Sequence, residues 1–90
     1  MPVAWRTRAL ADVVRIARYI ATDNPVAAAR VVRELLLAGD SLVLFPHRGR
    51  PGRRAGTREL VALRPYVIIY RVTGRETVTI LRVWHAAQDR

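Results

Sequence analysis

The densest group of chemically capable residues in this sequence is a run of arginines near its middle. Arg48, Arg50, Arg53 and Arg54 lie in the segment 46–57, which contains no acidic residue. A guanidinium group is planar and carries five N–H donors, so it pairs well with phosphate and carboxylate groups. We regard these four arginines as candidates for target binding, through phosphates or an acidic protein surface. A solvated loop whose charge only aids solubility is the alternative.

The rest of the chain is also strongly basic. Its sixteen basic residues are all arginine, and seven acidic residues leave a formal net charge of +9. Residues 1–45 contain six arginines and four acids, whereas residues 46–90 contain ten arginines and three acids, so the positive charge concentrates in the second half. Both a functional preference for guanidinium groups and codon composition would produce the absence of lysine.

Several classes of site lack the residues that they need. There is no cysteine for a disulfide, a zinc ribbon or a thiol nucleophile, and His47 and His85 lie far apart with no acidic cluster beside them. We therefore expect neither a metal nor another cofactor. The sequence also lacks a glycine-rich phosphate loop, a Gly-x-Ser-x-Gly motif, a secretory signal and a membrane-spanning apolar stretch. We expect a cytoplasmic protein without membrane contact.

Length and periodicity together predict one small α+β domain over residues 1–90, with 51% apolar residues to build its core. The predicted elements are a strand at 3–6, helices at 8–22 and 25–44, a basic irregular loop at 46–57, and strands at 58–63, 66–72 and 77–84. The two helices form an antiparallel hairpin, and the last three strands form an antiparallel β-meander.

Individual residues refine this prediction at the helices. Thr7 is the expected N-cap of the first helix, and Asn24 caps the second helix with proline following it. Asp12 lies at helical spacing from its neighbouring arginines, Arg8 and Arg15, which predicts weak ion pairs on the helix surface. Gly39 would bend the second helix or end it early, because glycine costs about 1 kcal/mol in a helix relative to alanine.

The predicted sheet is apolar on both faces. In the central strand, Val67 and Ile69 alternate with apolar residues of the other face, and Arg71 is the one charged residue. Leu81 and Val83 continue this pattern in the last strand. Because the helices cover one face, apolar residues on the second face predict a further cover. A partner chain is the simplest cover, and curvature of the sheet or shielding by the basic loop is the alternative.

Five stretches carry a likeness to a known family, in order and over nearly the whole chain. They are Tyr19-Ile20-Ala21 with Asn24-Pro25-x-Ala27-Ala28, Phe45-Pro46-x-x-Gly49-Arg50-x-Gly52, Gly56-Thr57-Arg58-Glu59-Leu60-Val61, Tyr66-Val67-Ile68-x-Tyr70-Arg71-Val72, and Val78-x-Ile80-Leu81-Arg82-Val83-x-His85-x-Ala87-Gln88. The chain thus resembles the RelE/ParE superfamily of toxins from bacterial type II toxin–antitoxin operons. The resemblance implies the same order of elements and a cognate acidic antitoxin whose C-terminal segment wraps the toxin. The expected antitoxin contacts are Val67, Ile69, Arg71, Leu81 and Val83.

The superfamily contains two activities, and the resemblance favours the ParE-like one. The 56–61 and 80–85 stretches are similar to ParE-like toxins, which poison DNA gyrase and need no catalytic residues. RelE-like toxins cleave messenger RNA on the ribosome, and they usually have an arginine in the central strand and a basic or aromatic residue after the last strand. This chain has Val67 at the first position and Ala86 and Ala87 at the second.

A ribonuclease would still need a proton acceptor and cations to stabilise a phosphorane. In that alternative, Arg58, Arg82 and His85 would form the catalytic site, with Glu59 as a further member. A purely structural role for His85 is favoured over this one. A non-toxic basic nucleic-acid-binding module is a third hypothesis, and the lack of a basic recognition helix weakens it.

Overall fold

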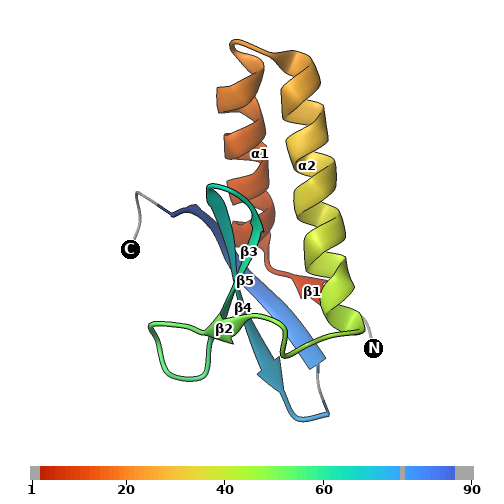
Figure 1. Cartoon of the computed structure of the whole chain (residues 1–90), viewed down its shortest axis with the longest axis vertical. Coiled ribbons are helices and arrows are strands. Elements are labelled where there is room, and N and C mark those ends of the chain that lie inside the picture. The colour runs from red at the N-terminus through yellow and green to blue at the C-terminus, as the bar shows by residue number, and fades with distance from the viewer. Residues whose placement is uncertain (1–2, 76, 87–90) are drawn as a thin grey trace.

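Two helices and five strands make up the molecule, and the computed structural model describes residues 3–75 and 77–86. The elements are β1 (Val3–Trp5), α1 (Thr7–Ala21), α2 (Pro25–Asp40), a 3₁₀ helix (Ser41–Val43), β2 (Arg50–Pro51), β3 (Arg58–Leu63), β4 (Tyr66–Thr73) and β5 (Thr77–His85). The strands form one mixed sheet in the order β1-β5-β4-β3-β2. The two helices run side by side along one face and extend past one end of the sheet (Figure 1).

The predicted α+β class is confirmed, but the three-stranded meander is an incomplete description of the sheet. β3, β4 and β5 are antiparallel neighbours as expected, whereas β1 pairs in parallel with β5 through Val3–Val78 to Trp5–Ile80. The 46–57 segment is not wholly irregular either, because β2 pairs with β3. A strand of two or three residues has no periodicity to recognise, so its pairing depends on tertiary contacts.

One of the two predicted helix N-caps is confirmed. The Asn24 side chain accepts a hydrogen bond from the Ala27 N–H at 3.0 Å, which confirms the predicted cap. The cap of α1 is Arg6 rather than Thr7, and its side chain makes no capping hydrogen bond. α2 ends at Asp40, four residues before the prediction. None of the helices among the described residues is both long and apolar enough to cross a membrane.

A close contact explains the position of Gly39 in the last turn of α2. The Trp5 ring and the Ile80 side chain lie where a β-carbon on Gly39 would be, so any larger residue would collide with them. The Trp5 indole also donates a hydrogen bond to Asp40 at 3.2 Å. Glycine therefore lets the helix approach β1 and β5 closely, and this contact joins the hairpin to the parallel edge of the sheet.

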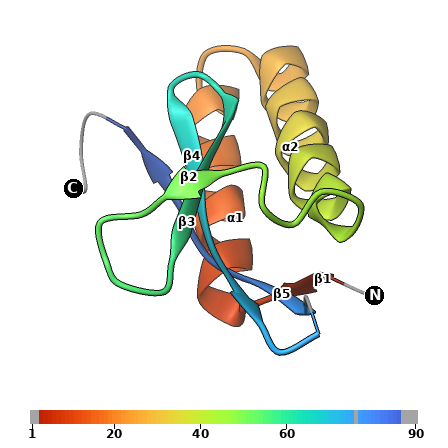
Figure 2. The same ribbon diagram turned by 60° about the horizontal axis from the view of Figure 1, so that its bottom comes forward.

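The main core lies between the hairpin and the helix-facing side of the sheet (Figure 2). It is built from side chains of α1, α2, the 3₁₀ helix and the three long strands. Its fully buried members include Leu35, Leu42, Ile68, Tyr70, Ile80 and Val83. Val83 thus points toward the helices, away from the second face.

The apolar residues of the second face, for which the sequence predicts a cover, are partly covered within the single chain. Val67 is 1% exposed and Ile69 is 8% exposed within the single chain. Trp84 is the direct partner of Val67 across β4 and β5. Ile69 lines a hollow together with Arg53 and Arg54, which the 46–57 loop brings over this face. Shielding by the loop, the alternative to a partner chain, therefore accounts for part of the cover.

Candidate functional site

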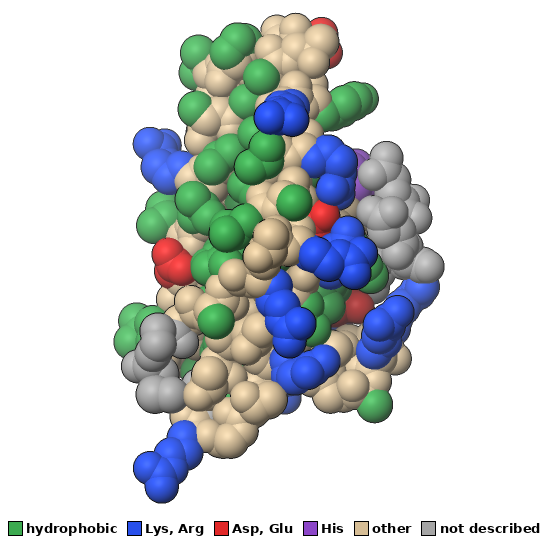
Figure 3. Space-filling model, turned by 180° about the vertical axis from the view of Figure 1, so that it is seen from behind, with side chains coloured by type: hydrophobic (Ala, Val, Ile, Leu, Met, Phe, Trp, Pro, Cys, Tyr) green, Lys and Arg blue, Asp and Glu red, His purple; other side chains and the backbone are tan. Residues whose placement is uncertain are grey.

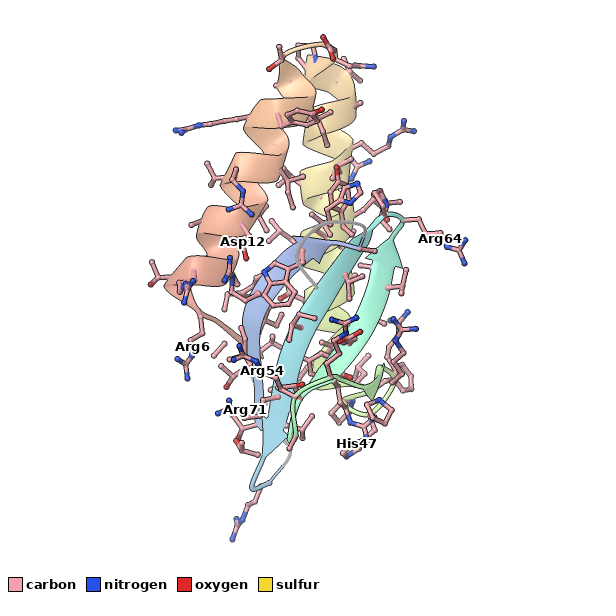
Figure 4. The ribbon with its side chains drawn as sticks, turned by 90° about the vertical axis from the view of Figure 1, so that its left-hand side faces the viewer. Arg6, Asp12, His47, Arg54, Arg64 and Arg71 are labelled. Carbon is pink, nitrogen blue, oxygen red and sulfur yellow. The ribbon has the colours of Figure 1, made fainter. Side chains whose placement is uncertain are left out.

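A hollow of about 530 Å³ lies on the face of the sheet that the helices leave open. We call it the arginine hollow. Its lining consists of Arg6, Arg8, Arg53, Arg54, Thr57, Glu59, Ile69, Arg71, Leu81, Arg82 and Trp84. Three separate parts of the chain supply the arginines: the start of α1, the 46–57 loop, and strands β4 and β5. Figure 4 looks onto this face, where Arg6, Arg54 and Arg71 lie around the strands.

A β-bulge shapes the floor of the arginine hollow. Ile69 pairs with Arg82 but Tyr70 pairs with Ile80, so Leu81 is an extra residue in β5. In a regular strand, two consecutive residues point to opposite faces, and a bulge relaxes this alternation. Leu81 and Arg82 accordingly both line the hollow. The bulge adds an apolar residue and a cation to the same surface.

Arg82 is held in place by a buried carboxylate on α1. Asp12, 1% exposed, accepts hydrogen bonds from Arg82 Nε at 2.8 Å and Arg82 Nη2 at 3.0 Å. The same carboxylate accepts the Val83 N–H at 2.9 Å. Val83 lies beyond Ile80, the last residue of β5 that pairs with β1. Asp12 also forms the predicted ion pair with Arg15 at 3.0 Å. The prediction that Asp12 lies on the helix surface is therefore wrong. Asp12 is buried and joins α1 to β5.

The pKa of Asp12 reflects this environment. Burial by itself would raise the pKa, because a charged carboxylate loses water. Hydrogen bonds from Arg82, the Val83 N–H and Arg15, together with the positive charge of Arg82, outweigh burial and hold the pKa of Asp12 below its ordinary value of 3.8. The carboxylate is therefore ionised at neutral pH and keeps Arg82 oriented.

Three side chains of β3 and β4 anchor the 46–57 loop beside the hollow. The Tyr70 hydroxyl donates to the Pro46 carbonyl at 2.8 Å and accepts the Gly49 N–H at 2.9 Å. Arg58 donates to the carbonyls of residues 47 and 49. Glu59 accepts the Arg53 N–H at 3.4 Å and forms an ion pair with the Arg50 guanidinium at 3.3 Å. The loop arginines are thus presented by a fixed segment.

Positive charge dominates the arginine hollow. Among the described residues that line it, Glu59 is the one acid; it is 5% exposed and is already engaged with the loop, and Arg82 is engaged with Asp12. Among the residues that the structure describes, the other hollow arginines make no side-chain ion pair. These are Arg6, Arg8, Arg53, Arg54 and Arg71, all of which are exposed. From behind, blue basic side chains gather along the lower right of the molecule, and others lie among the green hydrophobic side chains of the upper part (Figure 3).

The structure divides the four target-binding candidates of the loop into two pairs. Arg53 and Arg54 line the arginine hollow. Arg48 donates to the Ser41 hydroxyl at 2.8 Å, and Arg50 pairs with Glu59, so both make contacts that support the loop.

The antitoxin-binding candidates divide in a similar way. Ile69, Arg71 and Leu81 line the arginine hollow together with Arg53 and Arg54. Val67 and Val83 are 1% and 0% exposed, so they support the sheet from within. Candidates that the sequence assigned to two different partners therefore lie in one hollow.

The residues of the ribonuclease alternative do not lie in one cluster. Arg58 is opposite Tyr70 on the helix-facing side and binds loop carbonyls. His85 lies at the other end of β4, opposite Tyr66, and its ring packs edge-on against the tyrosine ring with 5.7 Å between centroids. Arg82 lines the hollow on the second face, where its guanidinium lies 5.4 Å from the Trp84 ring centroid.

Sequence reasoning missed Arg6, Arg8 and Trp84 as members of the hollow. No local signal identifies the two arginines, because they flank the start of α1 and meet the loop arginines only through the fold. Within residues 3–75 and 77–86, no group of three metal-ligating side chains comes together, and the hollow offers guanidinium groups rather than ligands. Its arrangement can bind and orient an anion.

Comparisons with known proteins agree on one family. Residues 3–90 match the family model described as the ParE toxin of the type II toxin–antitoxin system parDE. The chain is 46% identical to Toxin RelE2 of Caulobacter vibrioides, over 96% of each chain. It is 48% identical to Y4kP of Sinorhizobium fredii, whose name describes it as a toxin, over 97% of this chain and 90% of that protein. A solved structure titled "Chromosomal ParDE TA system from P. aeruginosa" superposes with a TM-score of 0.84 at 28% identity, over 94% of this chain and 95% of that chain.

Proposed function

Because this chain belongs to the ParE toxin family of type II toxin–antitoxin systems, we propose that it arrests bacterial growth by inhibiting DNA gyrase and that a cognate acidic antitoxin neutralises it. The toxin acts in the cytoplasm, where gyrase and its DNA are found. The observation that carries this proposal is the arginine hollow, a positive surface on the face of the sheet that the helices leave open. An inhibitor of a DNA-handling enzyme binds through a surface and needs no catalytic residues, and a positive surface is compatible with gyrase or its DNA.

Neutralisation follows from the same surface. An antitoxin segment with acidic side chains would pair with Arg54 and Arg71, whose guanidinium groups are exposed, and would place an apolar side chain against Leu81. Val67, Ile69 and Val83 offer little surface and would support this contact from beneath. Because the target candidates line the same hollow, a bound antitoxin would deny it to the target.

The test uses induced expression and a purified gyrase assay. Expression without the antitoxin is expected to arrest growth, and coexpression of the adjacent antitoxin gene is expected to restore it. Purified toxin is expected to reduce supercoiling or to trap cleaved DNA on gyrase. The Arg54→Gln/Arg71→Gln variant should lose the effect, whereas the Arg30→Gln/Arg64→Gln variant, with the same change in charge outside the hollow, should keep it. Normal growth with soluble, folded wild-type protein would contradict a toxin.

Ribosome-dependent cleavage of messenger RNA is the second candidate, because two relatives are named Toxin RelE2 and Toxin RelE1. Cleavage of ribosome-bound message with gyrase unaffected would favour it. The ribonuclease site would then be tested by Arg58→Ala, Arg82→Ala and His85→Ala. These three side chains make contacts in different parts of the structure. If none of the substitutions changes the rate of RNA cleavage, the catalytic site lies elsewhere.

A further inference from the structure

The strongest unexplained feature of the molecule is a set of five exposed guanidinium groups around one hollow. Like charges that face each other cost stability, and within residues 3–75 and 77–86 these arginines have no acidic side-chain partner, so they favour a ligand of opposite charge. Arg6 and Arg8 lie at the start of α1, which packs against β5, and Arg53 and Arg54 lie on the loop anchored to β3. Arg71 lies between them on β4. The cations therefore extend across the sheet, beyond the reach of a single small anion.

The floor of the hollow shows what kind of anion fits. Ile69 is 8% exposed, and Leu81 and Trp84 are partly exposed, so the floor is partly apolar. The exposed guanidinium groups around this floor offer charge-assisted hydrogen bonds, which are stronger than bonds between neutral groups. A polynucleotide supplies one phosphate with every unit, whereas a peptide reaches that charge density only with consecutive acids. Trp84 also lines the hollow, and tryptophan is a surface on which bases stack.

We propose that the arginine hollow binds the phosphodiester backbone of a nucleic-acid strand, with Arg6, Arg53, Arg54 and Arg71 as phosphate contacts. Contacts to the backbone carry no sequence information, so binding is insensitive to base sequence and strongly dependent on salt. This inference rests on the proposed function in one respect: if the protein inhibits gyrase, the hollow is where it would contact the DNA.

Glu59 has a defined part in this site as a positioning residue. It is an acid in a lining of arginines, yet its carboxylate accepts the Arg53 N–H and pairs with Arg50, which holds the loop at the edge of the sheet. If only net charge mattered, Glu59→Gln would strengthen phosphate binding by removing a negative charge. If Glu59 positions the loop arginines, the same substitution weakens binding. We expect the second result.

The test measures fluorescence anisotropy of labelled 12-nucleotide strands with the full chain. Three probes are used: single-stranded DNA, its duplex, and RNA of the same sequence. Arg54→Gln/Arg71→Gln is expected to weaken binding on the order of tenfold and to lower the slope of log K against log salt by about 1.4, since each phosphate contact contributes about 0.7 for a single strand. Arg30→Gln/Arg64→Gln is the control, because Arg64 points away from the hollow (Figure 4). The control should change affinity by less than about threefold.

Each outcome decides the proposal. Equal weakening in both double variants would overturn it in favour of diffuse attraction, and so would the absence of binding at low salt. Binding of a poly-glutamate peptide, lost in the same variant, with no measurable binding of any oligonucleotide would assign the hollow to an acidic protein alone and overturn the proposal. Preference among the three probes identifies the source of the phosphates. Oligonucleotide binding without inhibition of gyrase would leave the hollow's ligand established and remove the proposed target.

Discussion

The helix-covered face of the sheet and the face with the arginine hollow are covered by different groups. Apolar side chains of two helices close the first, and Leu35 and Ile68 there have no exposed surface. Cationic side chains and one loop surround the second, above Ile69 and Leu81. Burial of apolar area stabilises the folded state, whereas unpaired charge does not. The comparison indicates that the helix-covered face supplies most of the stability, whereas the second face carries the charges that we propose bind a ligand.

The largest expected effect comes from truncating a side chain on the helix-covered face. Ile68→Ala should lower the free energy of unfolding by about 3 kcal/mol, because it removes buried methyl groups and leaves a cavity. Val61→Ala, on the second face where Val61 is 45% exposed, should cost less than about 1 kcal/mol. Urea denaturation followed by circular dichroism measures both. Equal losses would show that the second face contributes to the core as much as the first.

An intermediate effect is expected at Asp12, which joins the two faces. Asp12→Asn should lower the free energy of unfolding by about 2 kcal/mol at pH 7, since it leaves the partly buried Arg82 without its charged partner. Because the pKa of Asp12 is lowered by folding, its charge stabilises the protein above about pH 4 and this contribution is lost as the pH falls through the lowered value.

The pH dependence gives this prediction a second measurement. The difference in unfolding free energy between wild type and Asp12→Asn should shrink as the pH falls below 4. The exposed Asp23 provides the control, and Asp23→Asn should change stability by less than about 0.5 kcal/mol. A difference that stays constant down to pH 2 would contradict this, because it would mean that the loss in Asp12→Asn does not come from the carboxylate charge.

The sequence was sufficient for the elements whose signals are local. Asn24 and Pro25 mark the start of α2, and the β3, β4 and β5 runs have strand composition, so periodicity and capping located them. The end of α2 was placed four residues late. Gly39 indicated that the helix bends or ends early, but its contact with Trp5 joins distant parts of the chain and cannot be read from local sequence.

The candidate site depends on relations that no local pattern contains. Arg6 and Arg54 meet because β1 joins β5 in parallel and the loop folds back along β3. Leu81 and Arg82 share a surface because of a bulge, and the bond from Arg82 to Asp12 spans 70 residues. Composition predicted a positive second half, yet the hollow takes arginines from both halves.

The smallest expected change in stability belongs to the arginine hollow and has the opposite sign. Arg54→Gln/Arg71→Gln should leave the free energy of unfolding unchanged or raise it by a few tenths of a kcal/mol, because it relieves repulsion among exposed cations. Raising sodium chloride from 20 to 200 mM should stabilise wild type more than this variant, since salt screens the repulsion that the variant lacks. Urea denaturation at both salt concentrations tests this. A loss above 1 kcal/mol would instead show that the arginine stems serve as apolar cover for Ile69, in which case their exposed charges would be a by-product of packing and the contrast between the faces would disappear.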